Sequence, residues 1–183
     1  MDLREVKTKR NIHNAFLELR SKRPLEKITV KELCERAEIS KTTFYLHYRD
    51  IYDLSDTLQL NEIKDIIRYI NSPEDLIYDP RKAARDLIEG FYAHRPMINI
   101  LFSGSQFSKL PERIELEIKE LLFGKFPELK DNVYANVRLT YQLKGSFYAF
   151  YQYENTFGYE AVLNSVDEIT ALFELKEITK PEQ

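Results

Sequence analysis

Apolar side chains recur along most of this chain at the spacing of an α-helix, and this pattern limits the fold more than any other feature. Ile12, Ala15, Phe16 and Leu19 fall at i, i+3, i+4 and i+7, which places them on one face of a helix. Glycine is rare, at five of 183 residues, Asn-Gly and Asp-Gly turns are absent, and no long stretch alternates between apolar and polar residues. The sequence therefore predicts an all-α protein of about nine helices.

The segment Thr29–Tyr48 is predicted to form two short helices joined by a tight turn. We expect the Thr29 hydroxyl to cap the first helix while the Glu32 carboxylate reaches back to the cap residue. After a turn at Glu38, Ser40 caps a second helix that presents a polar leading turn to solvent. Two helices in this relation form a helix-turn-helix, in which the second helix enters the major groove of DNA.

The second of these helices carries a resemblance to a known family. The run from Ser40 to Tyr48 (Ser-Lys-Thr-Thr-Phe-Tyr-Leu-His-Tyr), followed by Asp50, resembles the signature of the TetR/AcrR family of transcriptional regulators. Residues 7–58 match the family's DNA-binding domain in order and spacing, and the rest of the chain matches in helical character and length. Two positions depart from the family pattern: Glu38 stands where the family usually has glycine, and Ile51 stands where it usually has a phosphate-binding lysine.

The resemblance implies a division of the chain into three parts. These are a three-helix DNA-binding domain over residues 1–50, a helical effector-binding and dimerisation domain over residues 51–178, and a tail over residues 179–183 that we expect to be disordered. The charge agrees with this division, because residues 1–49 hold 12 Lys and Arg against 7 Asp and Glu (net +5), while the remainder holds 15 against 23 (net −8). A basic head on an acidic body favours contact between the head and a polyanion such as DNA, although surface charge also fluctuates by chance.

DNA contacts are expected at the start of each helix of the pair. Lys41 and Thr42 are expected to read base edges, because lysine donates to guanine and a threonine methyl contacts the methyl group of thymine. The resemblance implies phosphate contacts for Tyr45 and His47, and for Tyr45 the alternative is a partly buried ring with an exposed hydroxyl. The expected DNA-binding residues are Thr29, Lys31, Ser40, Lys41, Thr42, Thr43, Tyr45, His47 and Arg49. Phe44 and Tyr48 are expected in the core beneath the second helix.

Aromatic residues of the middle helices could line a pocket for an apolar or aromatic effector, which the resemblance also implies. The candidate lining residues are Tyr69, Phe91, Tyr92, Phe102, Phe107, Tyr141 and Tyr148. The alternative is that these side chains simply form the core, which is the commoner role of aromatic residues at helical spacing.

Two long helices near the end of the chain are expected to form a dimer interface. They are predicted over Asp131–Tyr153 and Tyr159–Lys176, and they are too apolar for one protomer to cover. The same pair from a second protomer would complete a four-helix bundle about a two-fold axis. The expected interface residues are Leu143, Phe147, Phe150, Val162, Val166, Ile169 and Phe173.

Other classes of function find little support in the residues. His13, His47 and His94 lack the spacing of metal ligands, and no Ser/His/Asp order, Gly-rich phosphate loop or HExxH motif is present, so we expect no enzyme activity, metal or cofactor. No run of about 18 apolar residues predicts a membrane span, and no apolar stretch of a signal peptide follows the N-terminus. A single cysteine, Cys34, fits a reducing cytoplasm.

The sequence therefore favours a cytoplasmic, homodimeric regulator of transcription. Its partners would be double-stranded DNA with a palindromic site, a second copy of itself and a small-molecule effector, and repression is the commonest role in the family it resembles. The alternative is a helix-turn-helix regulator or adaptor whose C-terminal domain binds a protein in place of a small molecule, as an activator or an organiser of DNA. A closed apolar cavity favours the first interpretation, and an exposed apolar patch favours the second.

Overall fold

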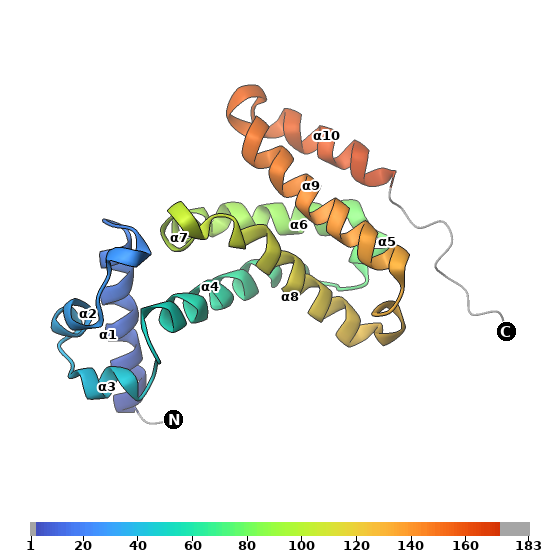
Figure 1. The fold of residues 1–183 in the computed structure, drawn as a ribbon. Helices are drawn as coiled ribbons and strands as arrows, with labels where there is room; N and C mark the ends of the chain where they lie inside the picture. Colours follow the sequence, from blue (N-terminus) through green and yellow to red (C-terminus); the bar gives the residue numbers. More distant parts are fainter. Residues whose placement is uncertain (1–2, 173–183) are drawn as a thin grey trace. The chain divides into compact units, whose positions relative to one another are not determined.

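The computed structural model describes residues 3–172, and every regular element within them is helical. The α-helices are α1 Leu3–Arg20, α2 Val30–Ala37, α3 Lys41–Tyr45, α4 Ile51–Ile67, α5 Asp75–Tyr78, α6 Pro80–Ala93, α7 Arg95–Leu101, α8 Lys109–Lys125, α9 Val133–Phe157 and α10 Tyr159–Ala171. Three short 3-10 helices lie at Leu25–Lys27, Gly104–Gln106 and Pro127–Leu129. The all-α prediction is confirmed for these residues, and Figure 1 follows the helices along the chain.

Several helices differ in extent from the sequence prediction. The one-turn helix α5 was not predicted, and it makes ten α-helices in residues 3–172 where about nine were expected. The apolar pattern predicts a fourth helix from Asp50 to about Asn71, but α4 ends at Ile67. Helix α9 continues beyond its predicted end at Tyr153 to Phe157. Gly158 is the single residue between α9 and α10. Its φ of 84° lies in a region that glycine adopts freely because it has no Cβ. Phe173, the predicted end of the last helix and the predicted tail lie outside the described residues.

The described chain divides into two compact units. Unit 1 contains residues 3–62 and 94–109, and unit 2 contains residues 63–93 and 110–172. The sequence-based boundary at residue 50 thus falls inside unit 1, and α7, far along the chain, belongs to the same unit as α1–α3.

Unit 1 is built on a small apolar core from α1, α2 and α3. Ile12 and Phe16 of α1, Leu33 of α2 and Phe44 of α3 are all fully buried. Two polar side chains tie the α7 segment to this core. The buried Arg20 at the end of α1 donates to the Ser103 carbonyl at 2.7 Å.

The second hydrogen bond that holds the α7 segment comes from Gln59 on α4. Gln59, which is fully buried, donates from its amide to the Leu101 carbonyl at 2.9 Å. Because a buried donor is costly to leave unpaired, both bonds hold the residues around α7 in place within unit 1.

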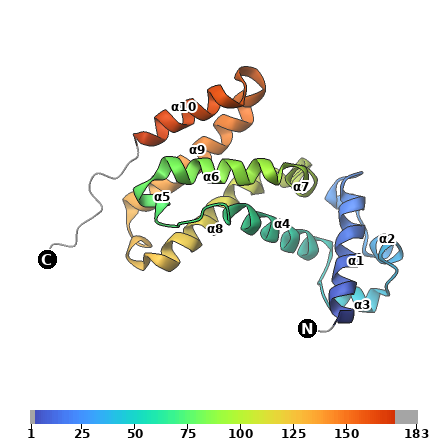
Figure 2. The same cartoon turned by 180° about the vertical axis from the view of Figure 1, so that it is seen from behind.

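Unit 2 centres on the antiparallel pair α9 and α10, which packs against α6 (Figure 2). Phe150 of α9 and Val162 and Val166 of α10 form a buried cluster, and Tyr92 of α6 packs against it. An ion pair between Arg85 of α6 and the buried Asp167 of α10 joins the same helices.

Candidate nucleic-acid interface

The start of α2 is fixed by a side-chain cap. The Thr29 hydroxyl accepts a hydrogen bond from the Glu32 backbone N–H at 3.3 Å, as the sequence predicted. The Glu32 carboxylate does not follow the expected reciprocal pattern, because it is ion-paired with Arg23 at 2.5 Å. Lys31 is exposed beside the capped turn and lies 3.9 Å from Glu35, at the limit of an ion pair. The positive end of α2 and Lys31 together present donors that suit a phosphate.

The turn between α2 and α3 depends on one unusual residue. Glu38 ends α2 in the left-handed region, at φ 56° and ψ 44°, and its backbone N–H bonds to the carbonyls of the preceding turn. Glycine is the usual residue in this conformation. Cys34 is buried against this turn, and burial raises the pKa of its thiol, which keeps the thiol protonated and unreactive.

Helix α3 is fixed by its cap residue, Ser40, and by two buried aromatic side chains, Phe44 and Tyr48. The Ser40 hydroxyl accepts from the Thr43 N–H at 3.0 Å and also bonds the Thr43 hydroxyl at 2.8 Å. Phe44 is fully buried and Tyr48 is 6% exposed, which confirms the core role predicted for both. The Tyr48 hydroxyl in turn bonds Nε2 of His13 on α1 at 2.7 Å. Helix α3 is therefore fixed to α1 through Tyr48.

The outer face of α3 is exposed. Lys41 and Thr42, the predicted base-reading residues, both face solvent, and Tyr45 is 56% exposed. Thr43 is half-buried, and its hydroxyl bonds the Ser40 hydroxyl of the cap. One face of a short, capped helix therefore offers a cation, a threonine and a tyrosine.

Leu46 belongs to this face but was not among the predicted contacts. It is 77% exposed and lies four residues after Thr42, so both side chains project from the same side of α3. The signal that could have found it is this i, i+4 spacing. An exposed leucine here can contact a thymine methyl group or a deoxyribose.

Two residues of the predicted DNA-binding set, Arg49 and His47, contact other side chains of the protein. The Arg49 guanidinium pairs with Asp53 at 2.9 Å, and the Asp53 carboxylate also accepts the Arg49 backbone N–H. The Arg49 side chain is nonetheless 87% exposed, so a phosphate would compete for it with Asp53. The His47 ring is half-buried and lies beside Tyr48, with the ring centroids 6.4 Å apart.

Several exposed cations in unit 1 have no acidic partner among residues 3–172. They are Lys7 and Arg10 on α1, Lys27, and Lys41 on α3. Cations without a carboxylate partner are those most available to a polyanion, since no internal ion pair must be broken first.

The residues predicted to line an effector pocket are distributed over both units. Phe102 is buried in unit 1, whereas Tyr141 and Tyr148 on α9 are 69% and 46% exposed in unit 2. Phe91 and Tyr92 contact each other edge to face. A cavity of about 520 Å³ lies within unit 1, and none of the seven predicted residues lines it.

The predicted dimer residues differ in exposure. Phe150, Val162 and Val166 are buried in the core of unit 2, so they hold the protomer's own helices together. Leu143 and Phe147 are half-buried, and Ile169 is 55% exposed. Tyr134, Val137, Tyr141 and Tyr148 of α9 are exposed and lie by helical spacing on the opposite face from Phe150, a face that the sequence prediction of the interface did not include.

No family model, curated protein or solved structure matches this chain. Within residues 3–172, no three His, Cys, Asp or Glu side chains gather in a way that could hold a metal ion. Among the described helices, none combines the length and the apolar character that crossing a membrane requires.

Proposed function

We propose that this protein is a DNA-binding regulator of transcription of the TetR/AcrR type, with α2 and α3 as its helix-turn-helix. The observation that carries the proposal is the exposed leading turn of α3, where Lys41 and Thr42 face solvent above the buried Phe44. A rigid helix with polar residues on its outer face suits the major groove, whose base edges offer donors and acceptors. The resemblance over residues 7–58 supports the same reading.

Contacts to DNA divide into two kinds in this proposal. Lys41, Thr42 and Leu46 meet base edges and determine sequence preference. Thr29, Lys31 and the unpaired Lys27 meet the sugar-phosphate backbone and determine overall affinity. The cytoplasm is the proposed compartment, since a single buried thiol suits a reducing environment.

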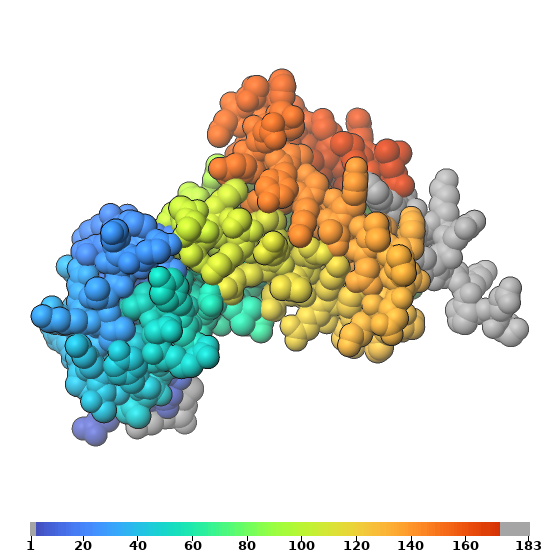
Figure 3. All heavy atoms as spheres, in the orientation of Figure 1, coloured from blue at the N-terminus to red at the C-terminus, as the bar shows by residue number. Residues whose placement is uncertain are grey.

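The protein acts as a homodimer in this proposal, because a single DNA-binding domain (residues 1–50, the head) neutralises too few phosphates to bind tightly. Helix α9 supplies a surface for the second copy, and its atoms lie at the surface of unit 2 in Figure 3. Its exposed side chains recur at heptad-like spacing, which is typical of helices that pack lengthwise. They are Tyr134, Val137, Tyr141, Tyr148 and Tyr151, and we call them the α9 stripe.

Gly145 gives a further reason to place a partner on the α9 stripe. It is exposed in the middle of α9, where glycine costs about 1 kcal/mol relative to alanine. Apart from the neighbouring backbone of α9 itself, no atom of residues 3–172 would lie within 4 Å of a Cβ at this position, so packing among these residues does not require glycine there. A helix of a second copy crossing closely at Gly145 would use the free space. Two heads on such a dimer would read a palindrome with half-sites about 34–36 Å apart, or another whole number of turns.

Regulation by a small molecule is part of the proposal. Helix α4 is continuous from unit 1 into unit 2, which begins at Ile63, so strain in one unit can be passed to the other along a single helix. An effector that binds one spacing of the two heads better than another shifts the equilibrium by its difference in affinity, typically about 1–3 kcal/mol. Release of DNA by the effector would make the protein a repressor.

The proposal is tested by selecting bound duplexes from a random pool with the full-length protein. We expect a palindromic consensus. Lys41→Ala should then cost about 1–3 kcal/mol on the consensus and relax preference at one position in each half-site. Lys31→Ala is the control, because it should weaken binding to all sequences about equally and reduce the salt dependence. An unchanged sequence preference in Lys41→Ala would contradict the base-reading role, and no enrichment at all would contradict the proposed function.

A second candidate function rests on the same α9 stripe. In place of a second copy, the exposed tyrosines could bind another protein, which would make the chain a regulator or adaptor that recruits a partner to DNA. Sedimentation of the purified protein at micromolar concentration separates the two candidates. A dimer supports the first, and a stable monomer that still selects DNA supports the second.

A further inference from the structure

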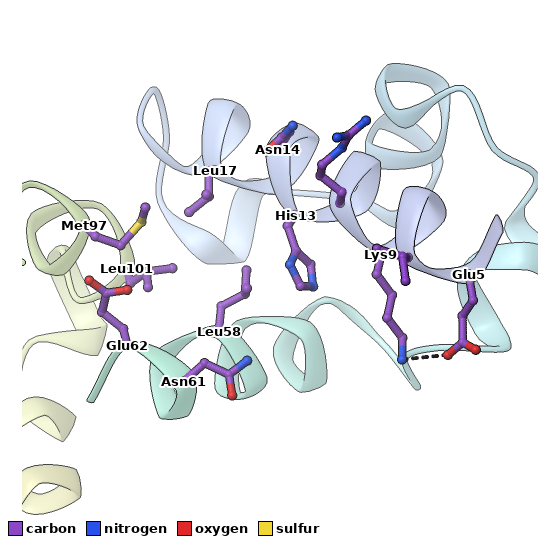
Figure 4. A pocket seen from close by; sticks show the side chains of 12 residues that line it. Glu5, Lys9, His13, Asn14, Leu17, Leu58, Asn61, Glu62, Met97 and Leu101 are labelled. Carbon is purple, nitrogen blue, oxygen red and sulfur yellow. Dashed lines mark ion pairs between the residues drawn. The ribbon is translucent and has the colours of Figure 1, made fainter. Parts of the chain in front are cut away.

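Unit 1 contains a pocket of about 520 Å³ between α1, α4 and α7 that is partly open to solvent, and we call it the cavity. Figure 4 shows that one end is formed by the apolar side chains of Leu17, Leu58, Met97 and Leu101, and that the ion pair between Lys9 and Glu5 lies at the other. Ligand sites in proteins are typically about 300–1,000 Å³ and mainly apolar, with a few polar groups that orient the ligand. The cavity therefore has the size and the lining of a small-molecule site.

The polar groups along the cavity wall differ in their availability. His13 is bonded to the Tyr48 hydroxyl at 2.7 Å, and Glu62 is bonded to Nδ1 of His94 at 2.8 Å. The Lys9–Glu5 pair is open to solvent, with side chains 45% and 46% exposed and a separation of 2.8 Å. An exposed ion pair is worth about 0–1 kcal/mol, so a ligand can replace one of its members at small cost.

The local charge decides which member a ligand would replace. The charged lining residues are two cations, Lys9 and Arg10, and two carboxylates, Glu5 and Glu62. Glu62 is bonded to His94 and Glu5 to Lys9, whereas Arg10 has no acidic partner among residues 3–172, so the charge left without a partner in the lining is positive. This excess of positive charge favours an anion that takes Lys9 from Glu5 over a cation that takes Glu5 from Lys9.

We propose that this cavity binds an anionic amphiphile, a small molecule with an apolar body and one carboxylate. The apolar body would lie against Leu17, Leu58 and Met97, and the carboxylate would pair with Lys9. A straight-chain fatty acid and an aromatic carboxylate share this chemistry. The site is separate from the aromatic residues of unit 2, because all of its lining comes from unit 1.

Occupancy of this cavity would oppose DNA binding, a consequence that rests on the proposed function. The carboxylate would neutralise Lys9 on the basic α1, and the apolar body would press on the wall that contains His13, the anchor of Tyr48 and hence of α3. The ligand and DNA would therefore reduce each other's affinity.

The test uses the full-length protein labelled with ¹³C in its methionine methyl groups, titrated with decanoate below its micelle concentration and without DNA. The chain has two methionines, so the spectrum holds few resonances, and Met97 in the cavity wall reports on the site. We expect the Met97 resonance to move saturably. A titration with 2-naphthoate distinguishes an aromatic ligand from a straight chain, and saturable movement with either supports the site.

The charge assignment is tested by two matched variants. Lys9 and Glu5 form an i, i+4 ion pair on α1, and Lys22 and Glu18 form another of the same kind outside the cavity. Lys9→Gln should weaken decanoate binding about fivefold, whereas Lys22→Gln should leave it unchanged. Decylamine should bind more weakly than decanoate.

Three results would overturn the inference. They are a Met97 resonance that does not respond to either carboxylate, decylamine binding as tightly as decanoate, and equal losses in the two lysine variants. Because the titration contains no DNA, its outcome is separate from the outcome of the duplex selection. If decanoate binds as expected but does not weaken binding of the selected duplex, the ligand site stands and its regulatory consequence fails.

Discussion

At the scale of single residues, the conformation of Glu38 is the clearest departure from local preference. It adopts φ 56° at the end of α2, and it is the only residue with a side chain at positive φ within residues 3–172. The left-handed conformation costs a residue with a Cβ roughly 1–2 kcal/mol relative to glycine. The turn that sets α3 against α2 therefore contains strain.

Replacing Glu38 with glycine should raise the free energy of unfolding by about 0.5–1 kcal/mol, because the relief of strain exceeds the greater chain entropy of glycine. Urea denaturation of the purified variant measures the change. Glu38→Gln is the control, since it removes the same charge and keeps the Cβ. If the two variants have equal stability, charge and not backbone conformation is the cause.

His13 is the residue whose protonation state should matter most within unit 1. Its ring bonds the Tyr48 hydroxyl, and burial, followed by the nearby charge of Lys9, lowers the pKa of His13 below its ordinary value of 6.5. The folded state therefore favours the neutral ring, and the unfolded state binds the proton more readily.

The contribution of His13 to stability is present above pH 6.5 and is lost as the pH falls through the lower pKa of the folded state. Wild type should therefore lose more stability between pH 7 and pH 5 than His13→Gln, which retains an acceptor for Tyr48. Denaturation curves across this range give the comparison. Parallel losses in the two proteins would remove His13 as the cause.

At the scale of helices, α8 and α9 are joined by a charged network around Glu115. This carboxylate is 8% exposed and accepts hydrogen bonds from Lys119 at 2.7 Å, from Lys144 at 3.1 Å and from the Thr140 hydroxyl. Burial by itself would raise the pKa of Glu115, but the hydrogen bonds from Lys119, Thr140 and Lys144 outweigh burial and hold the pKa at about 2. The folded state therefore favours the carboxylate form.

Glu115→Gln should lower the free energy of unfolding by about 1–3 kcal/mol at neutral pH, because two lysines lose the negative charge of their acceptor in a poorly hydrated site. The loss falls toward the lower figure if Lys144, which is 36% exposed, is rehydrated. In wild type this contribution is present above pH 4.5 and is lost as the pH falls toward about 2. Equal free energies of unfolding for wild type and variant at pH 7 would show that the network around Glu115 makes no net contribution to stability.

At the scale of the whole molecule, the α9 stripe is the surface on which the proposed dimer depends. Tyr141→Glu should convert the dimer to a monomer, because the change places a charge at the centre of an apolar contact. Tyr78→Glu is the matched control, since Tyr78 is a 58% exposed tyrosine on α5. Sedimentation measures both, and a dimer that survives Tyr141→Glu would place the interface elsewhere.

Much of the fold could be predicted from sequence because helices depend on contacts between near neighbours. The caps at Thr29 and Ser40 and the buried positions of Phe44 and Tyr48 were all predicted. Helix ends were less predictable, because α9 continues to Phe157 across residues that resemble a turn. Side-chain partners of Arg49 and Glu32 were not predicted, since each depends on which of several nearby charges is closest in space.

Local sequence was enough to predict that the chain is helical, where its two capped helices begin and which face of α3 is polar, because capping and helical periodicity act over three or four residues. Three features became known from the folded chain alone: α7 packs in the same unit as α1, Val162 and Val166 are buried while Tyr141 is exposed, and a cavity lies beside His13. These features depend on packing between residues far apart in the chain, and such contacts produce no regular spacing of residue types from which they could be predicted.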